Sequence, residues 1–439
     1  MAAAGERAMA AKRRLPVTLK LYARLTGMAT PLFGALLARR LARGKEDRAR
    51  VGERRGIAAA ERPEGPLVWV HGASVGEALA VLPLIERMRA RGLNVLLTSG
   101  TVTAAKLLEE RMPEGVVHQF APLDAPPFVR RFLDHWHPDL ALLVESELWP
   151  NLITEATARG TPFILINGRM SPRSFERWRI ARGTISALLG RLDLCLVQDA
   201  EDGERLANLG APRVVVTGNL KFDVPAPPAD PAALAALAQA IQLRPTILAA
   251  STHAGEEAAM IAAHIELKRK TPKLLTILVP RHPERGGEVA DLARDAGVPA
   301  VMRSREQLPD RGTEIYIADT IGELGLFYRI APIVFVGGSL VRHGGQNPIE
   351  PAKLDRAILH GPHVTNFAAI YSQLNRARGA ATVTDAASLA ASLGRLIADP
   401  MLVKQMGTMA RATVDKLGGA LDRTVAAIEP YLVQLRLKG

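Results

Sequence analysis

The chain has 439 residues, of which 48% are hydrophobic, so its size and composition exclude a disordered chain and indicate two or three globular domains. The single cysteine, Cys195, excludes an intrachain disulfide, which fits a reducing cytosol, and its apolar surroundings predict a buried side chain rather than a catalytic thiol. The net charge is +12, and residues 1–56 carry +10 of it, with 14 Lys and Arg against four Asp and Glu. This basic extremity indicates an anionic partner surface, and on charge alone nucleic acid and anionic lipid both qualify.

An uncharged apolar segment, residues 25–38, lies between basic flanks within this extremity. It is too short to span a bilayer, which takes roughly 20 apolar residues, it has no clear signal cleavage site, and Pro31 interrupts it. Because apolar length and positive charge occur together, we expect a helix that lies in a membrane interface, and no nucleic acid as partner. The other interpretation is an ordinary core helix with a solvated basic face. Residues 1–56 are therefore predicted to form a basic amphipathic segment that associates with a membrane.

From residue 66 onward, short β-rich runs alternate with longer stretches of helical spacing. This alternation predicts a parallel sheet with helices on both faces. The runs in the first half are residues 67–70, 94–99, 140–145, 162–168 and 213–218. The proline-rich residues 223–231 follow, and they are predicted to be a linker because proline neither pairs within a sheet nor continues a helix.

The same alternation restarts after the linker. Its runs are residues 246–252, 274–283, 314–319, 333–339 and 356–361, and the chain is predicted to be mostly helical from about residue 386. Two successive α/β domains of doubly wound, Rossmann-like architecture are expected, with a cleft between them. In such sheets ligands bind beyond the carboxyl ends of the strands, so motifs that directly follow strands carry most of the functional information.

The first such motif is "HGASVGE", residues 71–77, between a predicted strand and a predicted helix. Ser74 is a candidate N-cap with Glu77 three residues later, which is the spacing of a capping box. A carboxylate at a helix start favours its ionised form and can take a proton from a hydroxyl group, so Glu77 is also a candidate base. Residues 72–76 spell G-x-S-x-G, the pattern of a serine-hydrolase elbow, which leaves a hydrolase using Ser74 as an alternative. That elbow needs an oxyanion loop from an earlier strand, and no convincing strand precedes residue 66.

Two further strand ends carry charged residues in the first half of the chain. Glu145 and Glu147 lie beside Trp149 and Pro150, and alternation places both acids on one side if the strand continues that far. A solvated loop is the other interpretation. Lys221 follows a later strand and precedes the linker, where its ammonium group can hold a phosphate or a carboxylate, although a lone surface lysine is equally common.

The second half carries the remaining motifs. Arg281 and His282 directly follow an apolar strand, and Glu323 lies at the start of a predicted helix. The stretch "FVGGSLVRHGGQNPIEPA", residues 335–352, is glycine-rich and opens a predicted helix near Asn347 and Pro348. Glycines let backbone N–H groups approach an anion, and a helix start favours one, so this stretch predicts a phosphate cradle. The sequence has no His and Cys cluster with metal-ligand spacing, and neither a metal nor another cofactor is expected.

Five motifs in this order resemble the transferases of 3-deoxy-D-manno-octulosonic acid (Kdo) of lipopolysaccharide synthesis. They are "HGASVGE", "ESELWPN", "GNLKFD", "PRHPER" and "FVGGSL" with "GGQNPIEPA", and the resemblance runs from about residue 15 to the C-terminal helices. It implies a GT-B type glycosyltransferase, with an acceptor-binding domain over residues 57–225 and a nucleotide-sugar-binding domain over residues 226–439. The last helices are candidates for packing back on the first domain.

The resemblance also implies the substrates and the place of the reaction. The donor is CMP-Kdo, the acceptor is a lipid A precursor (lipid IVA), and transfer proceeds with inversion. The enzyme would act at the cytoplasmic side of the inner membrane, held there peripherally or monotopically by its N-terminal segment. A nucleotide-sugar epimerase on the same fold is a further alternative, and it would need neither a lipid nor an amphipathic N-terminus.

Residue by residue, Glu77 matches the proton acceptor of the family, and Glu145 and Lys221 match its transition-state stabilisers. No role is carried over for Glu147, His253 or His282. The positions that match the CMP-binding residues are Pro280, Arg281, Ile321, Gly322, Glu323, Asn347, Pro348, Ile349 and Glu350.

Overall fold

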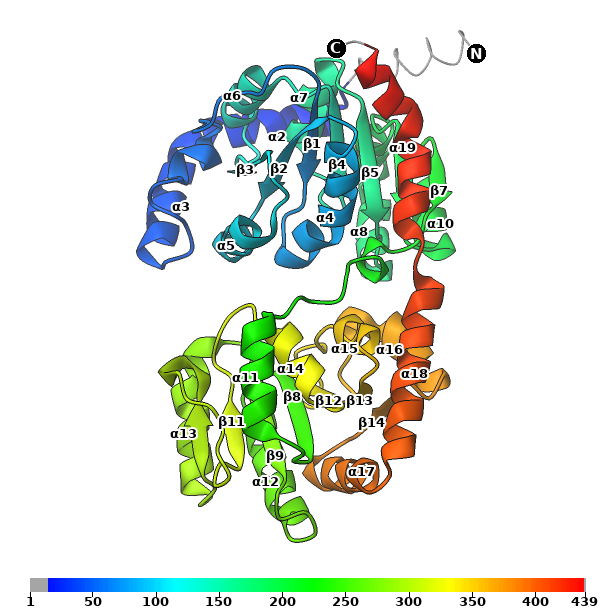
Figure 1. Ribbon diagram of the computed structural model, residues 1–439. Helices are drawn as coiled ribbons and strands as arrows, with labels where there is room; N and C mark the ends of the chain where they lie inside the picture. Colours follow the sequence, from blue (N-terminus) through cyan, green and yellow to red (C-terminus); the bar gives the residue numbers. More distant parts are fainter. Residues whose placement is uncertain (1–14, 438–439) are drawn as a thin grey trace. The chain divides into compact units, whose positions relative to one another are not determined.

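The computed structural model describes residues 15–437, so the first 14 residues of the predicted membrane segment lie outside the described part of the chain. The described chain divides into two compact units (Figure 1). Unit 1 contains residues 15–224 and returns at residues 418–437, and unit 2 contains residues 225–417. The boundary after Val224 lies within the proline-rich segment predicted to be the linker.

Unit 1 is built on a seven-stranded parallel sheet with the order β3-β2-β1-β4-β5-β6-β7. The strands are β1 (Leu67–His71), β2 (Asn94–Ser99), β3 (Val116–Phe120), β4 (Leu140–Val144), β5 (Phe163–Gly168), β6 (Leu194–Val197) and β7 (Val214–Val216). Every residue of β1, β4, β5 and β6 is buried, because helices cover both faces of the sheet. The predicted class is therefore confirmed for this unit.

Unit 2 repeats this plan with a second seven-stranded parallel sheet, in the order β10-β11-β9-β8-β12-β13-β14. The strands are β8 (Thr246–Thr252), β9 (Leu275–Pro280), β10 (Ala300–Met302), β11 (Ile315–Ile317), β12 (Ile333–Val336), β13 (Ala357–His360) and β14 (Ala380–Thr382). Sequence alone did not identify β3, β6, β10 and β14. Two of these, β10 and β14, are edge strands of three residues, β3 carries polar residues at its centre, and β6 is apolar but only four residues long, so none shows a long apolar run.

Helices connect successive strands in both units. The α-helices of unit 1 are α2 (Val17–Met28), α3 (Thr30–Ala42), α4 (Val75–Arg89), α5 (Val102–Arg111), α6 (Pro126–Trp136), α7 (Pro150–Ala158), α8 (Pro172–Ile180), α9 (Arg182–Leu189), α10 (Ala200–Asn208) and α19 (Ala420–Arg436). Those of unit 2 are α11 (Pro231–Ile241), α12 (Glu256–Lys268), α13 (Gly286–Asp295), α14 (Leu324–Ile330), α15 (Ile349–Lys353), α16 (Ala368–Arg376), α17 (Ala386–Ala398) and α18 (Pro400–Leu417). The 3-10 helices are η1 (Val51–Arg55), η2 (Leu220–Phe222), η3 (Pro283–Arg285), η4 (Arg303–Arg305) and η5 (Thr365–Phe367).

Each sheet has one point at which the strand order reverses. In unit 1 the reversal lies between β1 and β4, and in unit 2 it lies between β8 and β12. The connections that leave two such neighbouring strands run to opposite faces, which leaves a crevice at the carboxyl ends where ligands bind in open α/β sheets. We therefore expect ligand-binding residues in the segments that follow these four strands.

The C-terminal helix α19 completes the core of unit 1 (Figure 1). Its residues Ile428, Leu432 and Leu435 are buried in one hydrophobic cluster with residues of β1 and α4. Cys195 of β6 is also fully buried, and burial raises its pKa to about 12, so the thiol is inert as the sequence predicted.

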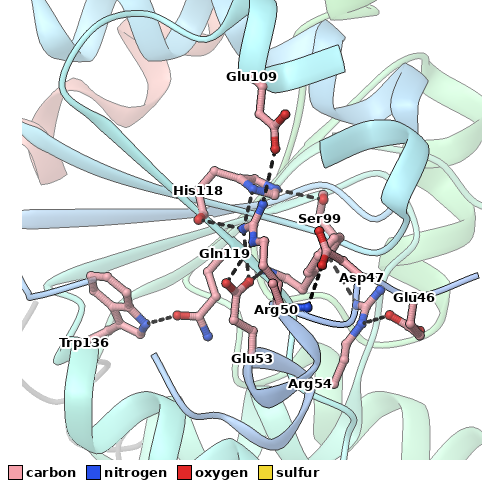
Figure 2. A network of polar contacts seen from close by, with 12 residues as sticks. Glu46, Asp47, Arg50, Glu53, Arg54, Ser99, Glu109, His118, Gln119 and Trp136 are labelled. Carbon is pink, nitrogen blue, oxygen red and sulfur yellow. Dashed lines mark hydrogen bonds and ion pairs between the residues drawn. The ribbon is translucent and has the colours of Figure 1, made fainter. Parts of the chain in front are cut away.

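The segment after α3 is attached to the sheet by a network of buried charges (Figure 2). Arg54 donates to the Glu46 carboxylate at 2.9 Å and to the carbonyl oxygens of Gly100 and Ala121 at 2.7 and 3.2 Å. Those carbonyls follow β2 and β3, so one guanidinium group links the N-terminal segment to two strand ends. Burial lowers the pKa of Arg54, while the hydrogen bond to Glu46 opposes that shift.

A second arginine completes this network (Figure 2). Arg50 donates to Glu53 at 2.9 Å and to the backbone oxygen of His118 at 3.0 Å. Glu53 also accepts the N–H of Phe120 at 2.6 Å. Burial, followed by the charges of Arg50 and Arg54, lowers the pKa of His118 to about 3, so this imidazole is neutral at physiological pH.

The network corrects the expectation that all the positive charge of residues 1–56 is available to an anionic partner. Arg40, Arg50 and Arg54 pair with Glu46 and Glu53, so they bear on folding rather than on an external anionic partner. Among the described residues 15–56, the basic side chains that remain exposed are Lys20, Arg24, Arg39, Arg43, Lys45, Arg48 and Arg55. Across residues 15–437, no single helix is both long and apolar enough to cross a membrane, and one bent pair, Ala386–Ala398 with Pro400–Arg436, meets that test only jointly.

Replacement of Ile428 by alanine tests the role of α19 in the core of unit 1. Because Ile428 is fully buried, Ile428→Ala is expected to lower the free energy of unfolding by about 2–5 kcal/mol through lost burial and a residual cavity. Val433 lies on the same helix and is 44% exposed, so Val433→Ala is the matched control and should change stability by less than about 1 kcal/mol. Urea titration measures both, and equal effects would contradict the packing described for α19.

Candidate functional site

Glu77 lies at the start of α4, directly after the central strand β1. Ser74 is the N-cap of this helix, and its hydroxyl oxygen accepts the N–H of Glu77 at 3.3 Å. In return, the Glu77 carboxylate accepts the Ser74 hydroxyl at 2.7 Å and the backbone N–H of Ala73 at 2.9 Å. This reciprocal pairing is a variant of the predicted capping box, because the carboxylate binds the N–H before the cap residue rather than the N–H of the cap itself.

The electrostatics of Glu77 differ from those of an ordinary capping carboxylate. Its pKa is raised chiefly by burial, and the nearby charges of Glu145 and Glu147 raise it further, while the hydrogen bonds from Ser74 and Ala73 partly oppose the shift. A raised pKa makes the ionised carboxylate a stronger base, which suits the transfer of a proton from a hydroxyl group near neutral pH. The cap therefore holds the side chain in place while its pKa stays raised.

An ion pair between Glu145 and Lys221 lies on the other side of the strand reversal in unit 1. The Lys221 Nζ is 2.5 Å from the Glu145 Oε1. Asn167, which is fully buried at the end of β5, positions both partners: its Nδ2 donates to the Glu145 Oε1 at 3.4 Å, and its Oδ1 accepts the N–H of Leu220 at 3.0 Å. Sequence reasoning missed Asn167; its signal in the sequence is an asparagine directly before the glycine that ends a β-rich run, and in the structure it has a φ of 52°, which asparagine tolerates.

The local backbone differs from the one assumed for the two acids of "ESELWPN". β4 ends at Val144, and Glu145 has a φ of 59°, so the alternation of a continued strand does not apply to Glu147. The two acids are nonetheless neighbours of Glu77. The indole N–H of Trp149 donates to Glu147 at 2.6 Å, and the Trp149 ring packs edge-on against the imidazole of His71 with 5.9 Å between centroids. These two contacts hold the side chains of Glu147 and Trp149 in place, so the segment is more ordered than a solvated loop.

The geometry around Ser74 does not support the hydrolase. Its hydroxyl group donates to the Glu77 carboxylate, and among residues 15–437 no histidine forms a hydrogen bond with it. β1 is also the first strand along the described part of unit 1, so no earlier strand there supplies an oxyanion loop. The G-x-S-x-G spelling follows from a helix cap and its close packing, since a Cβ on Gly72 would lie 3.1 Å from the backbone nitrogen of Ala78.

The residues matched to CMP binding all lie in unit 2, at the carboxyl side of its strands. Pro280 is the last residue of β9, and the backbone N–H of Arg281 donates to the Thr252 oxygen of β8 at 2.9 Å, which leaves the Arg281 side chain exposed. Within residues 15–437, the Arg281 guanidinium forms no hydrogen bond or ion pair. It is therefore placed to receive an anionic ligand.

The second part of this set precedes α14. Ile321 is 76% exposed, and Gly322 has a φ of 87°, a conformation that favours glycine. The Glu323 carboxylate pairs with Arg303 at 2.6 Å and accepts the Thr320 hydroxyl. Burial tends to raise the pKa of Glu323, but these two hydrogen bonds outweigh it and the pKa is lowered, so the group is an anion at neutral pH. An ionised carboxylate can accept hydrogen bonds from ligand hydroxyl groups.

The third part, Asn347 to Glu350, forms a turn that opens α15. The Oδ1 of Asn347 accepts the N–H of Ile349 at 3.0 Å, and its Nδ2 lies 3.4 Å from the Oε1 of Glu350. Pro348 is the N-cap residue rather than part of the first helical turn, and α15 has only five residues. The turn thus fixes the side chains of Asn347 and Glu350 against each other.

The glycine-rich loop before this turn is occupied by a carboxylate of the protein itself. The fully buried Glu256 accepts the backbone N–H groups of Gly338, Ser339 and Leu340 at 2.7, 2.9 and 2.9 Å, and that of His253 at 2.9 Å. The loop therefore does bind an anion, as its glycines indicate, but these amides are not available to a phosphate. The prediction that these amides form a phosphate cradle is therefore wrong for Gly338, Ser339 and Leu340. The sequence analysis did not identify Glu256.

The two units hold separate parts of the predicted site. Glu77, Glu145 and Lys221 belong to unit 1, and the nine nucleotide positions belong to unit 2. In the described part of the chain, no group of three or more His, Cys, Asp or Glu side chains is arranged to hold a metal ion.

Comparisons with known proteins bear on the identity of this site. The family model described as 3-deoxy-D-manno-octulosonic-acid transferase (kdotransferase) matches residues 49–224. A 3-deoxy-D-manno-octulosonic acid transferase from Haemophilus influenzae is 34% identical over 420 residues, which covers 94% of this chain and 98% of that protein.

Two solved structures bear on the fold. A glycosyltransferase from Rickettsia africae has a TM-score of 0.57 at 14% identity, covering 84% of this chain and 99% of that one. A UDP-GlcNAc 2-epimerase from Neisseria meningitidis has a TM-score of 0.55 at 14% identity, covering 85% of this chain and 100% of that one. The two likenesses support the predicted GT-B type fold, which a transferase and an epimerase share, so the activity must be argued from sequence family and site.

Replacement of Ser74 by alanine separates the capping role of Glu77 from its reactivity. Loss of the N-cap is expected to lower the free energy of unfolding by about 1 kcal/mol. In the wild type, the hydrogen bond from the Ser74 hydroxyl group lowers the pKa of Glu77. Without that hydrogen bond, the pKa of Glu77 should rise further. ¹³C NMR titration of the glutamate carboxyl groups, with Glu77→Gln to assign the signal, measures the shift.

Thr101 gives a matched control, because it caps α5 in the same way and its helix has no acidic residue in the first turn. Thr101→Ala should lower the free energy of unfolding by a similar amount and leave the pKa of Glu77 unchanged. A Glu77 pKa that stays constant or falls in Ser74→Ala would contradict the hydrogen-bonding assigned here.

Proposed function

Since the chain belongs to the family of 3-deoxy-D-manno-octulosonic acid (Kdo) transferases, we propose that it moves Kdo from CMP-Kdo to a lipid A precursor, lipid IVA. The chain is a glycosyltransferase of lipopolysaccharide synthesis; the donor, the acceptor and the roles of individual residues are the proposal. The observation that carries it is Glu77, a buried carboxylate of raised pKa beside the strand reversal of unit 1.

In the proposed reaction Glu77 accepts the proton of an acceptor hydroxyl group. The hydroxyl oxygen then forms a bond to the anomeric carbon of Kdo, while the bond from that carbon to the phosphate oxygen breaks and CMP leaves with the electron pair. A single displacement inverts the configuration. The raised pKa of Glu77 supports this role, because it reduces the difference between the pKa of the Glu77 carboxyl group and the pKa of the acceptor hydroxyl group.

Charged groups near the reacting atoms stabilise the transition state in this scheme. Glu145 and Lys221 form a preorganised pair that Asn167 holds in place, so their charges need no rearrangement during the reaction. Arg281 supplies a positive charge for the phosphate of the leaving CMP. The amides of Gly338, Ser339 and Leu340 take no part in this step, because Glu256 occupies them.

Substitution of Glu77 by glutamine tests the proton acceptor. Glutamine keeps the size of the side chain but cannot accept the proton, so transfer from CMP-Kdo to a tetraacyl lipid A precursor should fall by about 10²–10⁴-fold. Product formation is followed by mass spectrometry. Glu86 is exposed on the same helix, and Glu86→Gln is the matched control that should keep full activity. A folded Glu77→Gln protein with undiminished transfer would exclude this assignment.

An exposed apolar stripe on the N-terminal helices supports a place at the membrane. Its residues are Val17, Leu21, Leu25, Met28, Leu32 and Leu36, which follow helical spacing along α2 and α3 and are between 43% and 79% exposed. Exposed basic side chains flank the stripe, and this combination is typical of a helix pair lying in an anionic interface. We propose that it holds the enzyme at the cytoplasmic face of the inner membrane, where a lipid acceptor is available.

The stripe is also connected to the residues of the candidate site. The hydroxyl group of Tyr22 in α2 donates to Asp124 at 3.0 Å, and that carboxylate accepts the N–H groups of Asn151 and Leu152 at the start of α7. α7 begins at Pro150, within the "ESELWPN" segment that carries Glu145. Helix α2 is therefore anchored at the part of unit 1 that presents the acidic residues.

The combined substitutions Leu25→Glu, Met28→Glu and Leu32→Glu test the stripe. Each removes an apolar side chain and adds a negative charge, so binding to vesicles of phosphatidylethanolamine and phosphatidylglycerol should weaken by at least about tenfold. Co-sedimentation measures this binding. Leu243 of unit 2 is fully exposed, and Leu243→Glu is the control for a general loss of surface apolarity. Unchanged vesicle binding by the triple variant would contradict the proposed membrane contact.

A further inference from the structure

Three histidines with no assigned role gather at the carboxyl edge of the sheet in unit 2. This histidine cluster consists of His253 after β8, His282 after β9 and His343 in the loop after β12. The rings of His253 and His343 are stacked, with 4.1 Å between centroids and 14° between planes, and the ring of His282 stands edge-on to His253 at 6.0 Å. β9, β8 and β12 are adjacent and parallel, so the cluster lies beside the strand reversal at which this unit is expected to bind ligands.

His253 is held firmly at the centre of the cluster. Its backbone N–H binds the buried Glu256, and its Nε2 lies 3.1 Å from the Nε2 of Gln346. An amide nitrogen can only donate, so the imidazole Nε2 accepts and the ring proton lies on Nδ1. A Cβ on Gly338 would lie 3.3 Å from the His253 ring, which shows how closely the glycine-rich loop packs against it. The ring is therefore a preorganised N–H donor.

The charges around the cluster favour an anion. The acids behind it are already paired: Glu256 accepts four backbone N–H groups, and Glu257 accepts Arg285 at 2.7 Å and Thr252 at 2.9 Å. The exposed Glu284 lies 3.6 Å from His282.

The basic groups at the cluster remain available. Arg281 and Arg342 are exposed, and their side chains form no ion pair with any residue in the described range 15–437. Burial, and then the charges of His343, His282 and Arg281, lowers the pKa of His253 to about 4. His253 is therefore a neutral N–H donor at neutral pH, and stacked rings do not converge on one point as the ligands of a metal ion must.

We propose that the histidine cluster is an oxyanion subsite of the nucleotide-sugar donor, binding either the phosphate or the carboxylate that the donor carries. This inference rests on the proposed function, because that function supplies a donor with both groups. His343 and His282 are exposed and both pack against the ring of His253, so the cluster presents N–H donors to solvent at the edge where Arg281 also lies. Charge-assisted hydrogen bonds from imidazole and guanidinium groups suit either oxyanion.

Binding of three ligands by the His343→Gln and His282→Gln variants tests this subsite. Cytidine carries neither oxyanion, CMP carries the phosphate, and CMP-Kdo carries both. Loss of one charge-assisted hydrogen bond should weaken the ligand concerned by about tenfold. Calorimetry gives the affinities of cytidine and CMP, and the KM for CMP-Kdo comes from transfer assays. Weaker CMP with unchanged cytidine would assign the phosphate, and a raised KM with unchanged CMP would assign the carboxylate.

The controls separate this inference from the function on which it rests. His137 is exposed on unit 1 and has a φ of 39°, which asparagine tolerates, so His137→Asn should bind all three ligands as the wild type does. Thermal denaturation establishes that each variant is folded, and both substituted side chains are exposed. If CMP and CMP-Kdo affinities stay within twofold of the wild type in both variants, the subsite is excluded. If the wild type itself neither binds CMP nor transfers Kdo, the proposed function fails instead.

Discussion

The reversal of strand order in each parallel sheet is the constraint on which the candidate site depends. A parallel sheet must return every connection over one of its faces, and only where the direction changes do two adjacent strand ends leave room for a ligand. In unit 1 this place lies between β1 and β4, which deliver Glu77 and Glu145. In unit 2 it lies between β8 and β12, which deliver His253 and the glycine-rich loop. Each unit thus presents its chemistry at the edge that its topology leaves open.

Two carboxylates at helix starts show how their surroundings decide between structure and reactivity. Glu256 opens α12 and accepts four backbone N–H groups, so its charge is satisfied and it acts as a fixed part of the loop. Glu77 lies in the first turn of α4, accepts one backbone N–H and one hydroxyl group, and has two other acids nearby that raise its pKa. Both carboxylates serve their helix, and the pKa of Glu77 is raised by burial and by its acidic neighbours.

The positive charge of the N-terminal segment likewise serves two purposes. Arg50 and Arg54 form hydrogen bonds in a network that connects this segment to β3 and to the ends of β2 and β3 (Figure 2). Removing either partner of such a buried pair would leave an uncompensated charge, which is why these groups bear on the integrity of the fold. Exposed basic residues of α2, such as Lys20 and Arg24, remain available to an anionic surface.

The sequence by itself determined the fold class, ten of the fourteen strands of the two sheets and the family, because apolar periodicity and motifs at strand ends are local properties of the chain. It also identified Glu77, Glu145 and Lys221 as candidates, since each directly follows a β-rich run. Only the tertiary structure decided that Asn167 joins Glu145 to the Lys221 turn, and that Glu256 fills the loop whose glycines predicted a phosphate. These are contacts between residues far apart along the chain. Which polar group satisfies which partner is settled by three-dimensional packing, and no local pattern of residues encodes it.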